Sequence, residues 1–277
     1  MSEMLTMAVI TLREAARRRL LWIAVGCGAL LLAIFAVALK LQVIEFQSRP
    51  MSPFVRYQVE SGMLMIGLYM CDLLAVVMTI LTSIDTIAGE ISSGTIHAIA
   101  TKPIARWQIF ASKYLGFAAM TTAYVALTFS GTVAVSYAVT GVLPEHGVLG
   151  GALVAFECLV VLALTFCFGT KFSTLANGMV VLGIQAFAFM GGWLEQVSGF
   201  SQSAQIVTLG IWSSVLNPAE SLWRRAAYVM QTPLAGSLSF SPFANVSIPS
   251  GLAVGYAAAY LAIVLAVGVR RFAKRDL

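Results

Sequence analysis

Six long apolar segments alternate with polar ones along this chain. They cover residues 20–39, 63–84, 114–140, 150–169, 174–194 and 251–269. A helix of about 20 apolar residues crosses the hydrocarbon core of a bilayer, and each segment is close to that length or longer. The pattern therefore predicts an all-α integral membrane protein, with six transmembrane helices in a single transmembrane domain over residues 1–277.

A helical pattern also precedes the first span. Within residues 3–19, the apolar positions are Met4, Leu5, Ala8, Val9 and Leu12, and arginines follow toward the other side. Such a stripe predicts an amphipathic helix that lies in the membrane interface. A frayed tail is the alternative.

Two further connections differ in their patterns. Residues 40–62 contain Pro50 and Pro53, so this connection is expected to be irregular. In the longer segment 195–250, residues 206–216 are apolar but too short to span, and Asn217 followed by Pro218 is a typical helix start. This outer segment is therefore expected to hold re-entrant or interfacial helices, the second ending near Gln231.

Lys and Arg gather on one side of the predicted spans. Twelve of the 17 lie before span 1, between spans 2 and 3, between spans 4 and 5, or after span 6. Because positive residues mark the cytoplasmic side, we expect a multi-pass protein of the cytoplasmic (inner) membrane of a prokaryote, with both termini inside. The 59% hydrophobic content excludes a soluble domain. The net charge of +5 fits contact with anionic membrane lipid rather than nucleic acid.

The cytoplasmic segment between spans 2 and 3, residues 85–113, is polar, basic and interrupted. Gly94 and Pro103 break it into short pieces, and Ile96 adds an apolar side chain. A plain connector between helices needs only about 2–8 residues, so the length predicts a folded element that faces the cytosol. A long solvated loop is the alternative.

Three motifs here, E-x-x-x-G-T, K-P-x-x-R and K-x-x-G, resemble the loop after the second span in type-2 permease subunits of ATP-binding cassette (ABC) exporters. The matching residues are Glu90, Gly94, Thr95, Lys102, Pro103, Arg106, Lys113 and Gly116. Residues 11–21 and 270–277 are also similar to the ends of these permeases, so the resemblance spans the chain.

The resemblance implies a permease subunit that couples ATP hydrolysis by a separate cytoplasmic ABC ATPase subunit, present in two copies, to export of a substrate. A second permease subunit is expected to be a copy of this chain, and ATP and Mg would belong to the ATPase partner.

The resemblance also implies roles for particular residues. The cytoplasmic segment would be a coupling helix seated on the ATPase, with Glu90, Gly94, Thr95, Ile96, Lys102, Pro103 and Arg106 as coupling residues. Glu90 would brace the segment or pair with a basic residue of the partner, and Arg106 would reach a partner carboxylate. The N-terminal helix would be an elbow that touches the same partner through Arg13, Glu14 and Arg17.

The chain shows little reactive chemistry of its own. It has no G-x-x-x-x-G-K-[ST], HExxH or GxSxG sequence, and its four cysteines all lie within predicted spans. His97 and His146 fall on opposite sides of the membrane. We therefore expect no enzymatic activity, no cofactor and no metal in this chain.

Polar residues inside the spans are candidates for a translocation path. An Asp in hydrocarbon costs about 2.5–3.5 kcal/mol, so Asp72 and Glu157 are expected to face a cavity, to find donors or to be protonated. The other candidates are Thr79, Thr128, Thr132, Asn177 and Gln185. For the hydroxyl groups, hydrogen bonding to their own helix and packing against neighbours is the alternative.

Two other functions stay open. A gradient-driven secondary transporter would use Asp72 and Glu157 for proton coupling and would act without a partner. A non-transporting membrane module would be a sensor, or an anchor that assembles outer-face accessory proteins on residues 195–250. The resemblance also implies metalloenzyme maturation as a role of such a module, since some of the similar permeases serve it. Co-purification of an ATPase would distinguish an ABC exporter permease from a secondary transporter.

Overall fold

The computed structural model describes residues 7, 9–11, 19–48, 52–92, 105–201, 204–231 and 249–274. The helices of this part are α2 (Arg19–Ser48), α3 (Pro53–Ser92), α5 (Arg106–Thr140), α6 (Gly147–Gly169), α7 (Thr174–Ser201), α8 (Ala204–Leu216), α9 (Ala219–Met230) and α10 (Gly251–Ala273). Six of them, all but α8 and α9, are long and apolar enough to cross a membrane. The predicted all-α class with six spans is confirmed.

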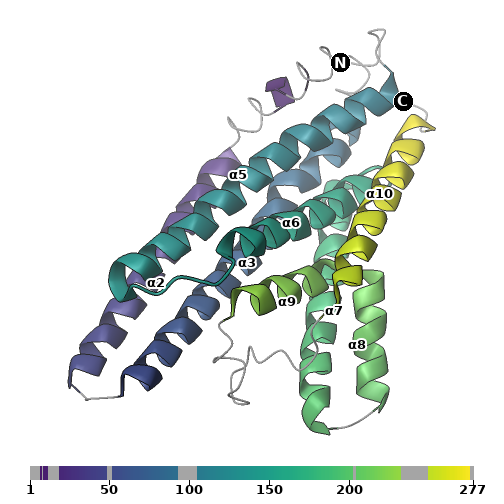
Figure 1. Cartoon of the computed structure of the whole chain (residues 1–277). Coiled ribbons are helices and arrows are strands. Elements are labelled where there is room, and N and C mark those ends of the chain that lie inside the picture. The colour runs from purple at the N-terminus through teal and green to yellow at the C-terminus, as the bar shows by residue number, and fades with distance from the viewer. Residues whose placement is uncertain are drawn as a thin grey trace.

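Helix α6 lies at the centre of the molecule. It contacts α3, α5, α7, α9 and α10, and its middle residues from Val160 to Ala163 are fully buried. A helix that is surrounded on all sides is apolar nearly all round, and this explains why Glu157 is the only charged residue in α6. Figure 1 shows α2, α3 and α5 as one inclined group, with the α7–α8 hairpin at the lower end of the molecule.

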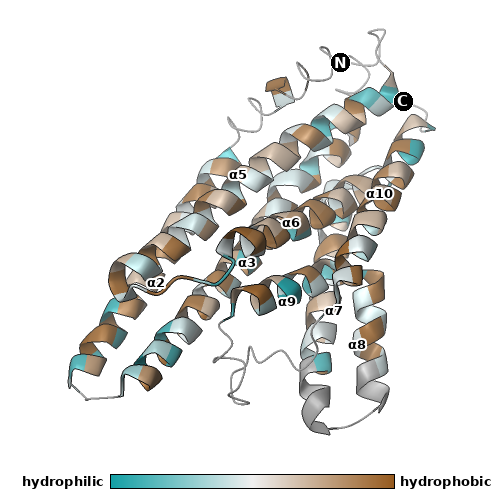
Figure 2. Ribbon diagram, viewed as in Figure 1, coloured by the Kyte–Doolittle hydropathy of each residue, from teal (hydrophilic) through white to brown (hydrophobic). Residues whose placement is uncertain are grey.

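The outer faces of the long helices are apolar. Hydrophobic colours dominate α2 and α10 in Figure 2, and large side chains such as Trp22 and Ile263 are 69% and 62% exposed. Side chains of this kind face the hydrocarbon in a membrane protein, where the lipid tails take the place of water.

The connection after α2 differs from the expectation. The predicted irregular stretch over residues 40–62 is mostly helical, because α2 continues to Ser48 and α3 already begins at Pro53. Proline is well tolerated at the first helical position, where its missing N–H has no helical partner. Ser52 supports this start, since its Oγ accepts a hydrogen bond from the Val55 N–H at 3.4 Å.

The two short helices between α7 and α10 occur as expected. The start of α9 is held by Asn217, whose Oδ1 accepts a hydrogen bond from the Ala219 N–H at 3.2 Å, and the helix ends one residue before Gln231. The sequence suggested that α9 lies at the membrane interface, and it did not predict that the helix is buried. Trp223 and Arg224 of α9 are each only 3% exposed, because the helix packs against α6.

The expected helix over residues 3–19 lies almost wholly outside the described residues. Of this stretch, residues 7, 9–11 and 19 are described, and Thr11 Oγ1 donates to the Met7 carbonyl at 2.9 Å. Arg13, Glu14 and Arg17 lie outside the described residues.

A close contact between α2 and α3 generates the first prediction. A Cβ atom at Gly67 would stand 2.5 Å from the Phe35 ring, whereas one at Gly62 would meet nothing within 4 Å. We expect Gly67→Ala to lower the free energy of unfolding by about 1–3 kcal/mol, the usual cost of overpacking. Thermal unfolding of the purified protein in mild detergent measures it. Gly62→Ala is the matched control, and an equal midpoint for the two variants would contradict the packing.

Candidate functional site

The ends of three helices are tied together at one end of the molecule, toward the upper right of Figure 1. Lys113 of α5 forms an ion pair with Glu90 of α3, and the two side chains are only 7% and 13% exposed. Arg106, at the start of α5, donates from Nη1 to the Ala273 carbonyl at the end of α10 at 3.3 Å. The last carbonyls of a helix have no partner within it and carry negative partial charge, so a guanidinium is well placed there.

An aromatic cluster lies below these ties. Phe110 of α5 packs edge-on against Phe166 of α6, with the ring centres 5.7 Å apart, and against Phe272 of α10 at 5.9 Å. Tyr114 and Phe117 of α5 also pack on Phe166. Aromatic rings bury large areas and prefer such tilted contacts. The start of α5 and the end of α10 are therefore fixed to the central helix.

The same end of the molecule joins α7 to α3. Asn177 of α7 is fully buried, and its Nδ2 donates to the Thr165 carbonyl of α6 at 3.0 Å and to the Ile84 carbonyl of α3 at 3.4 Å. Thr174 donates to the Asp85 carboxylate at 3.0 Å. The structure thus places Asn177 as a link between helices, and its predicted role in a path stays a prediction.

The candidate hydroxyl groups bond to their own helices. Thr79 donates to the Ala75 carbonyl at 2.7 Å, Thr128 to the Tyr124 carbonyl at 2.9 Å, and Thr132 to the Thr128 carbonyl at 2.9 Å. All three threonines are buried. These contacts agree with the alternative to a translocation path, because each hydroxyl hydrogen is donated to a carbonyl of its own helix.

The remaining polar candidates meet in one cavity of about 190 Å³ between four helices. Asp72 of α3, Glu157 of α6 and Gln185 of α7 line it, as does Glu220 of α9. The three carboxyl side chains are 5%, 0% and 7% exposed, in the order Asp72, Glu157, Glu220. A cavity was one of the surroundings expected for Asp72 and Glu157, and both residues line one; their predicted role in a translocation path stays a prediction. The sequence did not point to Glu220, which looks like an ordinary acidic residue in the first turn of a helix.

One arginine lies close to this cavity but is engaged elsewhere. Arg224 of α9 donates from Nη1 to Glu195 at 2.7 Å and from Nη2 to the Ser214 hydroxyl at 3.1 Å. It therefore links α9 to α7 and α8. Burial raises the pKa of the Glu220 carboxyl well above its ordinary value, Asp72 adds to the rise, and Arg224 opposes it.

The predicted coupling residues fall partly outside the described chain. Gly94, Thr95, Ile96, Lys102 and Pro103 lie outside the described residues. Glu90 and Arg106, at the two ends of the segment, are described. Glu90 braces the helix ends through Lys113, and Arg106 contacts α10 of its own chain.

A comparison with protein families decides what kind of protein carries these features. A family model described as ABC-2 family transporter protein matches residues 7–277. The chain belongs to the ABC-2 transporter permease family. Among curated proteins, none matches it. Permeases of this family are membrane components rather than catalytic subunits, and they generally work with an ABC ATPase.

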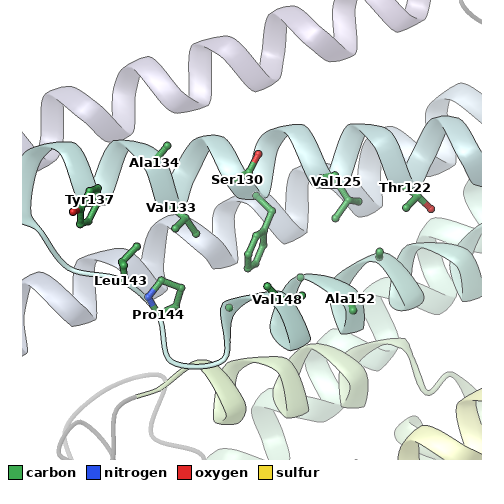
Figure 3. Close-up of a pocket in the computed structure, with 15 residues that line it drawn as sticks. Thr122, Val125, Ser130, Val133, Ala134, Tyr137, Leu143, Pro144, Val148 and Ala152 are labelled. Atoms are coloured by element: carbon green, nitrogen blue, oxygen red, sulfur yellow. The ribbon is translucent and has the colours of Figure 1, made fainter.

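This permease also has a larger cavity of about 650 Å³ between α5 and α6. Figure 3 shows its wall, which includes Val125, Val133, Leu143 and Val148. The polar residues in the wall are Thr122, Ser130 and Tyr137, and none of the described lining residues is charged. The wall is therefore mainly apolar and places no charged group that would select a ligand.

The buried ion pair of the permease gives the second prediction. Lys113→Met leaves the Glu90 carboxylate without its cation, and breaking a buried pair costs about 3–5 kcal/mol. We expect a large drop in the thermal midpoint, which the double variant Lys113→Met/Glu90→Gln should largely reverse because no charge remains uncompensated.

Lys171→Met is the control for removal of a cation at the same end. Lys171 is exposed and lies 5.7 Å from the Phe172 ring centre, so its loss should cost less than about 1 kcal/mol. A midpoint for Lys113→Met that equals that of Lys171→Met would show that the pair does not stabilise the helix ends.

Proposed function

We propose that this chain is the membrane-spanning permease of an ABC exporter, and that it converts ATP hydrolysis in a separate ATPase subunit into outward movement of a substrate. Membership of the ABC-2 permease family supports the class of partner. The observation that carries the proposal is the tying of three helix ends at one place, by the ion pair of Lys113 with Glu90 and the hydrogen bond from Arg106 to Ala273.

The tied end is the cytoplasmic end in this proposal, because basic residues gather there. Lys171 and the C-terminal residues Arg270, Arg271 and Lys274 join Lys113 and Arg106 on this side. Positive residues favour the cytoplasmic side of a membrane protein. Both chain termini would then be cytoplasmic, and the membrane would be the inner membrane of a prokaryote.

Force applied at the tied end would reach the membrane as helix movement. A partner that pushes on residues 85–113 acts on the end of α3 and the start of α5, and the aromatic cluster carries the displacement to α6 and α10. Packed elements of this kind move as rigid bodies rather than deform continuously. A rigid end of the permease is therefore what an ATPase subunit needs in order to tilt the spans.

The proposed assembly contains two ATPase subunits and two permease subunits, the second permease being a copy of this chain. ATP and Mg would be bound in the ATPase subunits. The residues of the coupling segment that would sit on the partner are Gly94, Thr95, Ile96, Lys102 and Pro103, with Glu90 as the internal brace.

Removal of the Arg106 side chain tests this coupling. We expect Arg106→Ala to lower substrate-stimulated ATP hydrolysis by about three- to tenfold in vesicles that contain the permease and its ATPase partner. A hydrogen bond from a charged donor contributes about 1.5–3 kcal/mol when buried and less at an exposed position such as this one. Lys40→Ala, an exposed cation at the opposite end of α2, should leave the rate unchanged.

Two results would contradict the proposal. The first is full coupled ATP hydrolysis and normal subunit assembly in Arg106→Ala. The second is movement of substrate by vesicles that contain this chain alone without nucleotide, which would favour the gradient-driven transporter.

A further inference from the structure

The cavity between α3, α6, α7 and α9 holds three carboxyl groups, and no Lys or Arg of the described chain lines it. Three carboxyl groups, from Asp72, Glu157 and Glu220, line about 190 Å³. Arg224, the nearby cation that acts on Glu220, is already bonded to Glu195 and Ser214. The cavity is therefore an acidic site within an apolar part of the molecule.

Three of the carboxyl oxygens in this cavity have no hydrogen-bond donor of the described chain within normal geometry. Both Oε atoms of Glu157 and the Oδ1 atom of Asp72 are buried and have no hydrogen-bond partner in the described part of the chain. A buried polar atom without a partner costs about 1–3 kcal/mol, so natural proteins rarely keep one. Three such atoms beside one cavity are placed to accept hydrogen bonds from a bound molecule that carries donors.

The walls of the cavity favour an organic molecule over a metal ion. No group of three or more His, Cys, Asp or Glu among the described residues has the geometry to hold a metal. The Tyr69 and Phe189 rings line the cavity and stack with centres 6.3 Å apart, and Tyr69 also packs on Trp223 at 5.3 Å. Aromatic rings attract cations through their faces and cover the apolar body of a ligand.

The cavity has an entrance between two spans. Leu73 of α3 and Leu182 of α7 line it and are 44% and 38% exposed, so its rim lies between these helices. Gln185 stands beside Glu157, and its Oε1 accepts a hydrogen bond from Asn217 at 2.8 Å. This bond fixes the Gln185 side chain in the wall.

We propose that this cavity binds a small organic cation, whose protonated amine is held by Glu157 and Asp72 and whose apolar or aromatic body lies against Tyr69 and Phe189. The inference rests on the proposed function, since it names the class of substrate that the permease would carry. Each N–H of the ammonium group donates to a carboxylate oxygen, and this supplies the donors that the described chain lacks.

Direct binding to the full-length permease tests this. Radiolabelled phenethylamine is the probe, measured on the purified chain in lipid nanodiscs without the ATPase. We expect saturable binding that unlabelled phenethylamine displaces, while the neutral 2-phenylethanol and the anionic phenylacetate, which have the same ring and similar length, do not. The three compounds differ mainly in the charge of the head group.

Variants locate the site. Asp72→Asn and Glu157→Gln keep the side-chain shape and remove one charge, and each should weaken binding by about tenfold or more, as loss of a buried charge partner does. Glu60→Gln is the matched control. Glu60 is a buried carboxyl on the same helix, paired with Arg56, and stands about 18 Å from Asp72 along the helix axis at 1.5 Å per residue. Its replacement should leave binding unchanged.

Several outcomes would overturn the inference. They are equal displacement by all three compounds, displacement by sodium ions at constant ionic strength, and amine binding that neither Asp72→Asn nor Glu157→Gln weakens. Where a variant fails to fold, the competition on the unaltered chain still decides.

The result of the binding experiment can be distinguished from the result of the ATP-coupling experiment that tests the proposed function. Binding is measured without the ATPase, so failure of ATP coupling does not affect it. If ATP hydrolysis is coupled and phenethylamine does not bind, the substrate class is wrong and the exporter stands. If phenethylamine binds and ATP hydrolysis is not coupled, the cavity binds organic cations and the proposed exporter role is wrong.

Discussion

Lys113 and Glu90 stabilise this permease only as a pair, because a charge buried among membrane-spanning helices finds no partner in lipid. Their ion pair joins α3 to α5 at one end of the spans. At the other end, Arg224 and Glu195 join α9 to α7. Each pair satisfies its charges inside the protein and fixes the relative position of two helices, so the bundle is held at both ends by charge pairing and in the centre by α6.

The middle of the bundle follows a different rule. Asp72 and Glu157 are buried as deeply as the paired residues, but several of their oxygens have no hydrogen-bond partner in the described chain. The fold therefore satisfies its charged groups at the two ends and leaves carboxyl groups without donors at the cavity between them. This division fits the proposed function, since a binding cavity must be open to a ligand whereas the helix ends must be rigid to transmit movement.

Sequence patterns predicted the parts of the fold that depend on local chemistry. Six spans follow from the length of the apolar segments, and the start of α9 follows from Asn217 and Pro218. The continuation of α2 to Ser48 and the start of α3 at Pro53 were missed because Pro50 and Pro53 suggested an irregular connection. Proline marks a helix start as well as a break, and only the structure decides between the two.

Contacts between distant segments were harder to predict. The sequence placed Asp72 and Glu157 inside spans, with a cavity as one of several expected surroundings, but it did not predict that Glu220 of α9 lies at the same place. Lys113 was matched to a motif, and its pairing with Glu90 depends on how α3 and α5 cross. Helical periodicity shows which face of a helix is polar, while the neighbour of that face is set by the packing of the whole bundle.

The most direct measurement is photo-crosslinking from single positions at the two ends of the permease. A photoreactive residue would replace Trp107, at the start of α5 and 48% exposed, or Val148, at the start of α6 and 92% exposed. Coupling through the tied end predicts a crosslink to the ATPase subunit from position 107 and none from position 148. A crosslink from position 148 without one from position 107 would place the partner at the wrong end and contradict the proposed coupling.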